Sequence, residues 1–214
     1  FGWRAVTGRW PPYYPDHPDN AQASVHIGKG SPTSVKFGYK SNFPHAYQEA
    51  LYVLDWTYGR ILAVHLLERG AGYVGSSEVF LRGRPLNVTD LGFGPDGAMY
   101  FVTGGRKTQS ALYRVRYVGP DVKASPATTQ QTARSKLSGK ARSLRRKLEF
   151  HHGKPSQDAI DDALDHLGSP DPRIRYAARI ALEHQPLERW RHAALTGNGA
   201  PLTLLTGWTA LAHA

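Results

Sequence analysis

Apolar and polar residues follow a period of two through residues 30 to 118. Short apolar runs at residues 51–54, 61–64 and 99–102 are separated by turn residues, among them Pro95-Asp96-Gly97. Runs of this length, broken in this way, are typical of short β-strands joined by tight turns. The pattern predicts an antiparallel β region without a long helix between Val35 and Tyr117.

This β region contains an internal repeat. EALYVL at residues 49–54 matches GAMYFV at residues 97–102, which lies 48 positions later. The match extends to both sides, pairing SVKFG at 34–38 with DLGFG at 90–94, and GRILAV at 59–64 with SALYRV at 110–115. A period of about 40–50 residues with several short strands is typical of β-propeller blades, which must stack on neighbours to bury their faces. We expect two four-stranded blades side by side, at residues ~30–81 and ~82–118 of a β domain spanning residues 1–120.

After residue 155 the period changes to 3.6, which indicates helices. The first apolar stripe contains Ile160, Ala163, Leu164 and Leu167, and the second contains Ile174, Ala177, Ala178, Ala181 and Leu182. Between them, Asp171-Pro172 supplies an N-cap and a first-turn proline. Short paired helices of this kind predict a HEAT-type solenoid segment over residues 156–214.

Residues 121–155 connect the two regions and hold most of the positive charge. They contain nine Lys or Arg and two acidic residues, a net +7 in a chain of net charge +10. Apolar residues recur there at helical spacing, at Leu137, Ala141, Leu144 and Leu148. We expect a basic amphipathic linker helix with this stripe against protein and with Arg142, Arg145 and Arg146 in solvent. No aromatic residues are interleaved with the charges from Lys123 to Lys147, which disfavours nucleic-acid binding.

The amino-acid composition excludes several kinds of cofactor site and covalent cross-link. The chain contains no cysteine, which excludes disulfides, iron–sulfur clusters and covalent haem within it. No apolar run reaches the ~18 residues of a membrane span. The chain begins at Phe1 and ends inside an apolar helical pattern, so we expect an internal fragment of a longer protein.

Several stretches resemble one bacterial family. LYVLDWTYGRILAVHL at 51–66 and EVFLRGRPLNVTDLGFGPDGAMYFVTGGR at 78–106 resemble the closing blades of proteins described as membrane-bound dehydrogenase-like or sorbosone-dehydrogenase-like. RSLRRKLEFHHG at 142–153 and DPRIRYAARIALE at 171–183 resemble the linker and HEAT repeats that follow in them. The resemblance implies the last two blades of a propeller, followed by a truncated HEAT array.

The resemblance also implies a function. It suggests a periplasmic or exported quinoprotein-type oxidoreductase that oxidises a sugar or alcohol with PQQ and calcium. Electrons would pass to a c-type cytochrome partner or domain, with haem c located downstream of this chain. A second class stays open, in which propeller and HEAT array form a non-catalytic scaffold for polysaccharide or protein.

Propeller topology predicts which loops share the ligand face. The entry to the first strand of a blade and the loop after its second strand lie at the same end. In the second blade these positions are Asn87, Thr89, Asp90, Gly104, Gly105, Arg106 and Lys107, and in the first they are Ser31, Thr33, Asp55, Trp56 and Tyr58.

These residue types suggest binding of a carboxylated cofactor. Arg106 offers a planar bidentate donor and Lys107 a point charge, while Gly104 and Gly105 allow close approach to the backbone. Asp55 and Asp90 are candidate calcium ligands. The alternative is structural: both aspartates cap turns, and Arg106 pairs with the neighbouring blade. No histidine falls on this face, so the catalytic base is unassigned.

Overall fold

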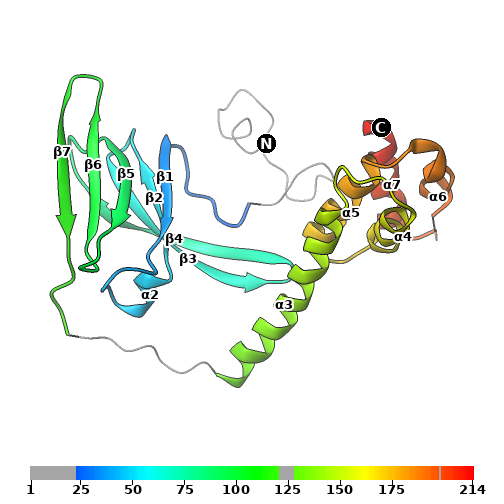
Figure 1. The fold of residues 1–214 in the computed structure, drawn as a ribbon, viewed down its shortest axis with the longest axis horizontal. Coiled ribbons are helices and arrows are strands. Elements are labelled where there is room, and N and C mark those ends of the chain that lie inside the picture. The colour runs from blue at the N-terminus through cyan, green and yellow to red at the C-terminus, as the bar shows by residue number, and fades with distance from the viewer. Residues whose placement is uncertain (1–22, 121–127, 198) are drawn as a thin grey trace. The chain divides into compact units, whose positions relative to one another are not determined.

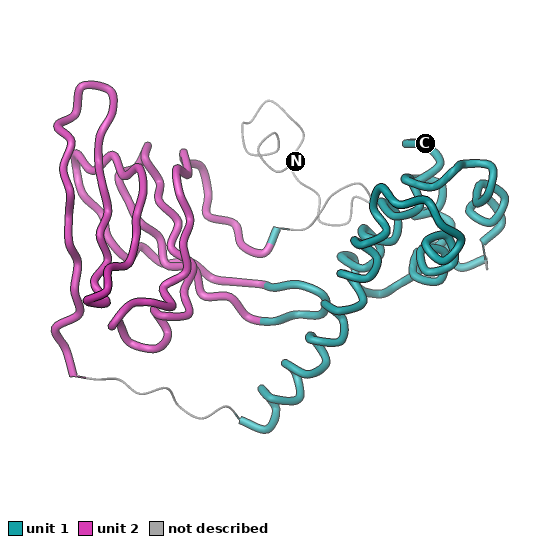
Figure 2. Tube along the Cα trace, viewed as in Figure 1, with its two compact units in different colours: residues 1–23, 68–73, 128–214 teal, residues 24–67, 74–127 magenta. Residues whose placement is uncertain are grey.

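The computed structural model describes residues 23–120, 128–197 and 199–214. The chain divides into a β unit, residues 24–67 and 74–127, and a helical unit, residues 1–23, 68–73 and 128–214. Figure 2 shows the two units in different colours. Residues 1–22 and the connector residues 121–127 lie outside the described part of the chain.

The β unit consists of two antiparallel sheets (Figure 1). The first has the order β1 (Pro32–Phe37), β2 (Leu51–Asp55), β3 (Arg60–Arg69) and β4 (Gly72–Arg82), and the second β5 (Val88–Phe93), β6 (Met99–Gly105) and β7 (Thr108–Val115). One short helix, α2 (His45–Gln48), lies between β1 and β2. The antiparallel β region is thus confirmed.

Within the described residues, the second sheet has three strands where we expected four. Residues 116–120, which follow β7, form no strand. Gly119 and Pro120 end this segment, and a proline lacks the N–H that a strand ladder needs.

A hydrophobic core lies between the two sheets. Tyr52, Leu54 and Ile61 of the first sheet pack there with Met99 and Phe101 of the second, and all five are buried. Burying a large apolar side chain contributes about 1.5–3 kcal/mol. The two sheets therefore stabilise each other face to face.

The first strands of the two sheets also contact each other directly. Thr33 Oγ1 donates to the backbone oxygen of Val88 at 2.9 Å, and Ser34 Oγ donates to Asp90 Oδ1 at 2.7 Å. Ser34 and Asp90 begin the matching SVKFG and DLGFG segments. The two copies of the repeat are therefore stacked first strand against first strand.

The helical unit follows the 3.6-residue pattern. Its helices are α3 (Thr129–Phe150), α4 (Gln157–His166), α5 (Pro172–Glu183), the 3₁₀ turn η1 (Leu187–Arg189), α6 (Arg191–Thr196) and α7 (Pro201–His213). Asp171 caps α5 as expected, because its carboxylate accepts the Arg173 N–H at 2.9 Å. The core contains Leu148, Ile160, Leu167, Leu182 and Trp190, with small alanines on α5. None of the helices in the described ranges is long and apolar enough to cross a bilayer.

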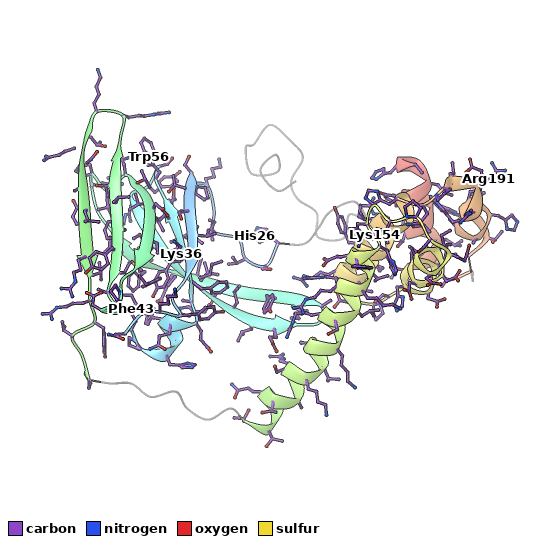
Figure 3. All side chains as sticks on the ribbon, viewed as in Figure 1. His26, Lys36, Phe43, Trp56, Lys154 and Arg191 are labelled. Carbon is purple, nitrogen blue, oxygen red and sulfur yellow. The ribbon has the colours of Figure 1, made fainter. Side chains whose placement is uncertain are left out.

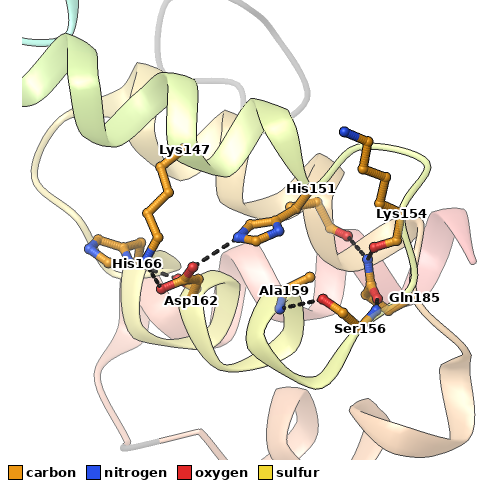
Figure 4. A network of polar contacts seen from close by, with 9 residues as sticks. Lys147, His151, Lys154, Ser156, Ala159, Asp162, His166 and Gln185 are labelled. Atoms are coloured by element: carbon orange, nitrogen blue, oxygen red, sulfur yellow. Dashed lines mark hydrogen bonds and ion pairs between the residues drawn. The ribbon is translucent and has the colours of Figure 1, made fainter.

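Polar contacts join α3, α4 and the loop between them (Figure 4). Asp162 lies between two basic groups: Lys147 Nζ is 2.7 Å from Oδ1, and His151 Nε2 is 2.8 Å from Oδ2. Gln185 Oε1 accepts the Ser156 N–H at 2.9 Å, which fixes the start of α4. The Asp162 bonds hold α4 against the end of α3, and the Gln185 bond joins the start of α4 to the residues that follow α5.

The tip of the β3–β4 hairpin belongs to the helical unit, which no sequence pattern predicted. Arg142 Nη2 lies 2.6 Å from Glu68 Oε1, and Arg145 Nη1 donates to the Ala71 oxygen at 2.7 Å. Asp171 Oδ2 accepts the Ala71 N–H at 2.6 Å. Helices α3 and α5 therefore both bind the hairpin tip.

These contacts correct the expected orientation of the basic helix. Leu137 was expected against protein but is 69% exposed. Arg142 and Arg145 were expected in solvent, but their side chains are only 13% and 27% exposed. The hairpin tip supplies carbonyl and carboxylate acceptors, and long arginine stems can lie along apolar surface while the guanidinium reaches such groups.

Candidate functional site

A cavity of about 660 Å³ lies at the loop end of the β unit, and we call it the Trp56–Arg106 cleft. Seven expected ligand-face residues line it: Ser31, Thr33, Trp56, Thr89, Gly104, Gly105 and Arg106. In Figure 3, Trp56 lies toward this end of the sheets and Phe43 toward the other. The strand topology thus brings loops from both copies of the repeat to one cavity.

Three further lining residues were not anticipated: Val102, Thr103 and Ser110. Val102 and Thr103 precede the glycines of β6, and a side chain at Gly104 would lie 2.8 Å from Ser110 Oγ. Alternation along β6 puts Val102 on the same face as Gly104, so the sequence could have indicated Val102 as a lining residue. Ser110 lines the cleft only because β7 pairs with β6.

The loop between β6 and β7 has an unusual backbone. Gly105 pairs with Thr108, so only Arg106 and Lys107 form the turn. Both have positive φ, 46° and 66°. A two-residue hairpin of this type favours Asn or Gly at these positions, and a bulky residue in the left-handed region costs about 1–2 kcal/mol. The loop therefore carries two positively charged side chains at its tip, in a backbone conformation that costs stability.

Trp56 orders this loop. Its Nε1–H donates to the Gly104 oxygen at 2.9 Å, and the guanidinium carbon of Arg106 lies 5.3 Å from the ring centroid. A guanidinium over an indole gains about 0.5–1 kcal/mol at an exposed site. Gly105 has a φ of 100°, which favours glycine, and passes close to the same indole.

Arg106 contacts the neighbouring sheet through this ring rather than through a carboxylate. Within the described ranges, neither Arg106 nor Lys107 has an acidic partner, and both are exposed. Lys107 does not line the cleft but stands beside it at the loop tip. The guanidinium N–H groups of Arg106 are therefore available for an anion.

The two candidate metal ligands are engaged elsewhere. Asp55 is 1% exposed and accepts Arg60 Nε at 2.8 Å and the Ser31 N–H at 2.9 Å. Asp90 accepts Ser34 Oγ and the Leu91 N–H. The Ser34 hydrogen bond, and then that of Leu91, lower the pKa of Asp90 below its ordinary value of 3.8. Both carboxylates therefore accept hydrogen bonds from donors of the protein itself.

Tyr58 and Asn87 also lie outside the cleft lining. Tyr58 is exposed, with the Arg60 guanidinium 5.1 Å from its ring centroid. Asn87 Nδ2 donates to the Trp56 oxygen at 3.2 Å and so supports the Trp56 loop. It also lines a second cavity of about 320 Å³ together with Thr103, Gln109 and Tyr113.

No cluster of three or more His, Cys, Asp or Glu residues that could hold a metal occurs among the residues described above. Comparisons of the chain with protein-family models, curated proteins and solved structures found no match.

Proposed function

We propose that the two sheets are blades of a β-propeller, and that the Trp56–Arg106 cleft binds a small anionic molecule with a flat ring. The observation that carries this proposal is the β6–β7 loop, where Arg106 and Lys107 adopt positive φ beside a half-buried indole. Backbone strain of this kind concentrates at functional sites. A loop shaped only for connection would place Asn and Gly there.

The stacked first strands and the shared core support the propeller. Neighbouring blades contact in this manner, and the repeat provides the first three strands of a blade twice. In the helical unit, α4 with α5 and α6 with α7 form short helix pairs, which support a HEAT-type array.

The donor set suits a carboxylated quinone such as PQQ. Arg106 can donate two parallel hydrogen bonds to a carboxylate, Trp56 offers an aromatic surface, and Thr33 and Thr89 offer hydroxyl groups. When bound, a quinone accepts electrons from an alcohol substrate. The residues do not fit calcium in the same way, because Asp55 and Asp90 already bind protein donors.

Within this proposal the chain is part of a periplasmic or exported oxidoreductase acting on a sugar or alcohol. Electrons would pass to a c-type cytochrome domain or partner. The scaffold function is the competing proposal, since the same cleft could hold an acidic sugar without any redox step.

The test is calorimetric titration with PQQ of wild type, Arg106→Ala and Arg116→Ala. Arg116 is also exposed but follows the opposite end of β7, so it is a matched control. A charge-assisted hydrogen bond contributes about 1.5–3 kcal/mol, so Arg106→Ala should weaken binding roughly tenfold or more. Arg116→Ala should bind like wild type.

Circular dichroism checks that each variant is folded. Equal affinity of all three proteins for PQQ would show that Arg106 does not take part in binding. Failure of the wild type to bind PQQ, with binding of an acidic oligosaccharide instead, would favour the scaffold.

A further inference from the structure

The cavity of about 320 Å³ in the β unit lies beside the Trp56–Arg106 cleft, and we call it the Asn87–Tyr113 cavity. Thr103 lines both, so the two are neighbours. Thr103, Ala111 and Tyr113 line it from the second sheet, on the face that also carries Phe101 of the core. The cavity is therefore on the side of this sheet that packs on the first sheet. Its other lining residues are Pro85, Asn87, Thr108 and Gln109.

The lining of this cavity is polar but uncharged. Thr103, Thr108 and Tyr113 contribute hydroxyl groups, and Asn87 and Gln109 contribute amides. Hydroxyl and amide groups can both donate and accept hydrogen bonds. None of the described lining residues is acidic or basic, and an ion buried without a partner is strongly unfavourable. The lining therefore selects an uncharged ligand whose own groups donate and accept.

Part of this polar lining has no partner within the protein. Thr103 is only 8% exposed, yet its hydroxyl bonds to none of the residues that the structure describes. In the same described ranges, the Tyr113 hydroxyl and the Gln109 amide group also have no hydrogen-bond partner. Buried hydroxyl groups are normally hydrogen-bonded. A ligand hydroxyl in the cavity would supply the bond that Thr103 lacks.

Other contacts hold the lining groups in place. The Tyr113 ring stacks on Phe101, with centroids 4.9 Å apart and the planes 14° from parallel. Asn87 Nδ2 donates to the Trp56 oxygen at 3.2 Å, which leaves the Asn87 amide oxygen as an acceptor. Thr108 Oγ1 donates to the Gly105 oxygen at 2.5 Å, so toward a ligand this hydroxyl can only accept. A lining that is already ordered loses less conformational freedom on binding.

We propose that the Asn87–Tyr113 cavity binds an uncharged, polyhydroxylated small molecule, such as a monosaccharide or a polyol. Each hydroxyl of such a molecule donates and accepts, as the lining does, and the volume falls in the usual range for small-molecule sites. Because Thr103 belongs to both cavities, this molecule would contact a ligand in the cleft as its sugar or alcohol substrate. That role rests on the proposed function, whereas the binding itself does not.

The experiment is an NMR titration of the chain with glucose, mannitol and glucuronate, followed at the backbone amides of Gln109 and Ala111. Glucose and mannitol should shift both amides. Glucuronate carries a carboxylate in place of one hydroxymethyl group of glucose. It should bind here at least about tenfold more weakly, because the lining offers no cation.

Three variants test the lining directly. Thr103→Val and Tyr113→Phe each remove one hydroxyl and keep the shape of the side chain, and each should weaken glucose binding about three- to tenfold. Ala111→Leu fills the cavity and should abolish binding, which gives a second test if Thr103→Val is unfolded. Tyr117→Phe, at an exposed position that follows β7, is the matched control and should bind like wild type. Circular dichroism checks that each variant is folded.

Two results would overturn the inference. Neither neutral probe could shift the Gln109 and Ala111 amides, or folded Tyr113→Phe and Ala111→Leu could bind glucose as well as wild type does. Titration of the same protein with PQQ separates this inference from the proposed function. PQQ binding without glucose binding would refute the Asn87–Tyr113 site alone. Glucose binding at Gln109 without PQQ binding would support this site and refute the quinone in the cleft.

Discussion

Trp56 donates its indole N–H to the carbonyl oxygen of Gly104 at 2.9 Å, and the two residues occupy equivalent positions in the two copies of the repeat. Each lies at or just after the end of the second strand of its sheet. The repeat therefore places two loops of the same kind next to each other, and the Trp56–Arg106 cleft lies where they contact.

Trp56→Phe should lower the free energy of unfolding by about 1 kcal/mol, because it removes one hydrogen bond and keeps an aromatic ring beside Arg106. Trp208→Phe is the matched control, since Trp208 on α7 is 50% exposed. Urea denaturation of both variants measures the difference. Equal losses at the two positions would show that the Gly104 bond contributes nothing.

Ser34→Ala should raise the pKa of Asp90 toward its ordinary value of 3.8, because the Ser34 hydrogen bond is the largest cause of its depression. A depressed pKa stabilises the folded state above the ordinary value, and this contribution is lost as the pH falls. An NMR titration of the side-chain carboxyl carbon reports the shift. Asp96, whose pKa is lowered chiefly by Arg114, should not change and serves as the internal control.

Periodicity and repetition predicted most of the β unit. The match between EALYVL and GAMYFV indicated the equivalent strands, and strand direction indicated that Trp56, Gly104 and Arg106 reach one end. These features are local or depend on a repeat, so they are visible in a single sequence. The sequence did not indicate that the described part of the second sheet has no fourth strand. The apolar pattern of β7 is the same whether or not another strand pairs with its outer edge.

The partners of charged side chains could not be predicted in the same way. Asp55 and Asp90 looked like ligands because of their positions, and only the fold shows that Arg60 and Ser34 occupy them. The same limit applies to Arg142, whose partner Glu68 is 74 positions away. Helical periodicity assigns a residue to a face but does not identify what packs there.

Asp162→Asn should reduce the loss of stability that the helical unit shows as the pH falls into the acid range. The Lys147 ion pair, followed by the His151 contact, lowers the pKa of Asp162 from its ordinary value of 3.8. The stabilisation is complete above that value and is lost as the pH falls through the lowered folded-state pKa. Wild type should therefore lose more free energy of unfolding between pH 6 and pH 3 than Asp162→Asn does. Asp165→Asn, at an exposed position of the same helix, should show the full loss.

Arg142→Gln should destabilise the helical unit by about 1–2 kcal/mol, whereas Arg146→Gln should change stability by no more than about 0.5 kcal/mol. Arg142 is bonded to Glu68 at 2.6 Å, and its guanidinium lies 5.3 Å from the Tyr73 ring centroid, while Arg146 is exposed. The loss is held to this range because Arg142 Nη1 is buried without an acceptor, which offsets part of the gain. Guanidinium chloride denaturation at fixed salt measures both variants.

The double variant Glu68→Gln with Arg142→Gln isolates the pair. A direct interaction makes the double variant less destabilised than the two single losses added together. Hydrogen exchange at the Ala71 amide gives an independent measurement, because this amide lies in the same hairpin tip and is bonded to Asp171. Arg142→Gln should speed its exchange and Arg146→Gln should not. Additive losses with unchanged exchange at Ala71 would mean that α3 does not hold the hairpin tip through Arg142.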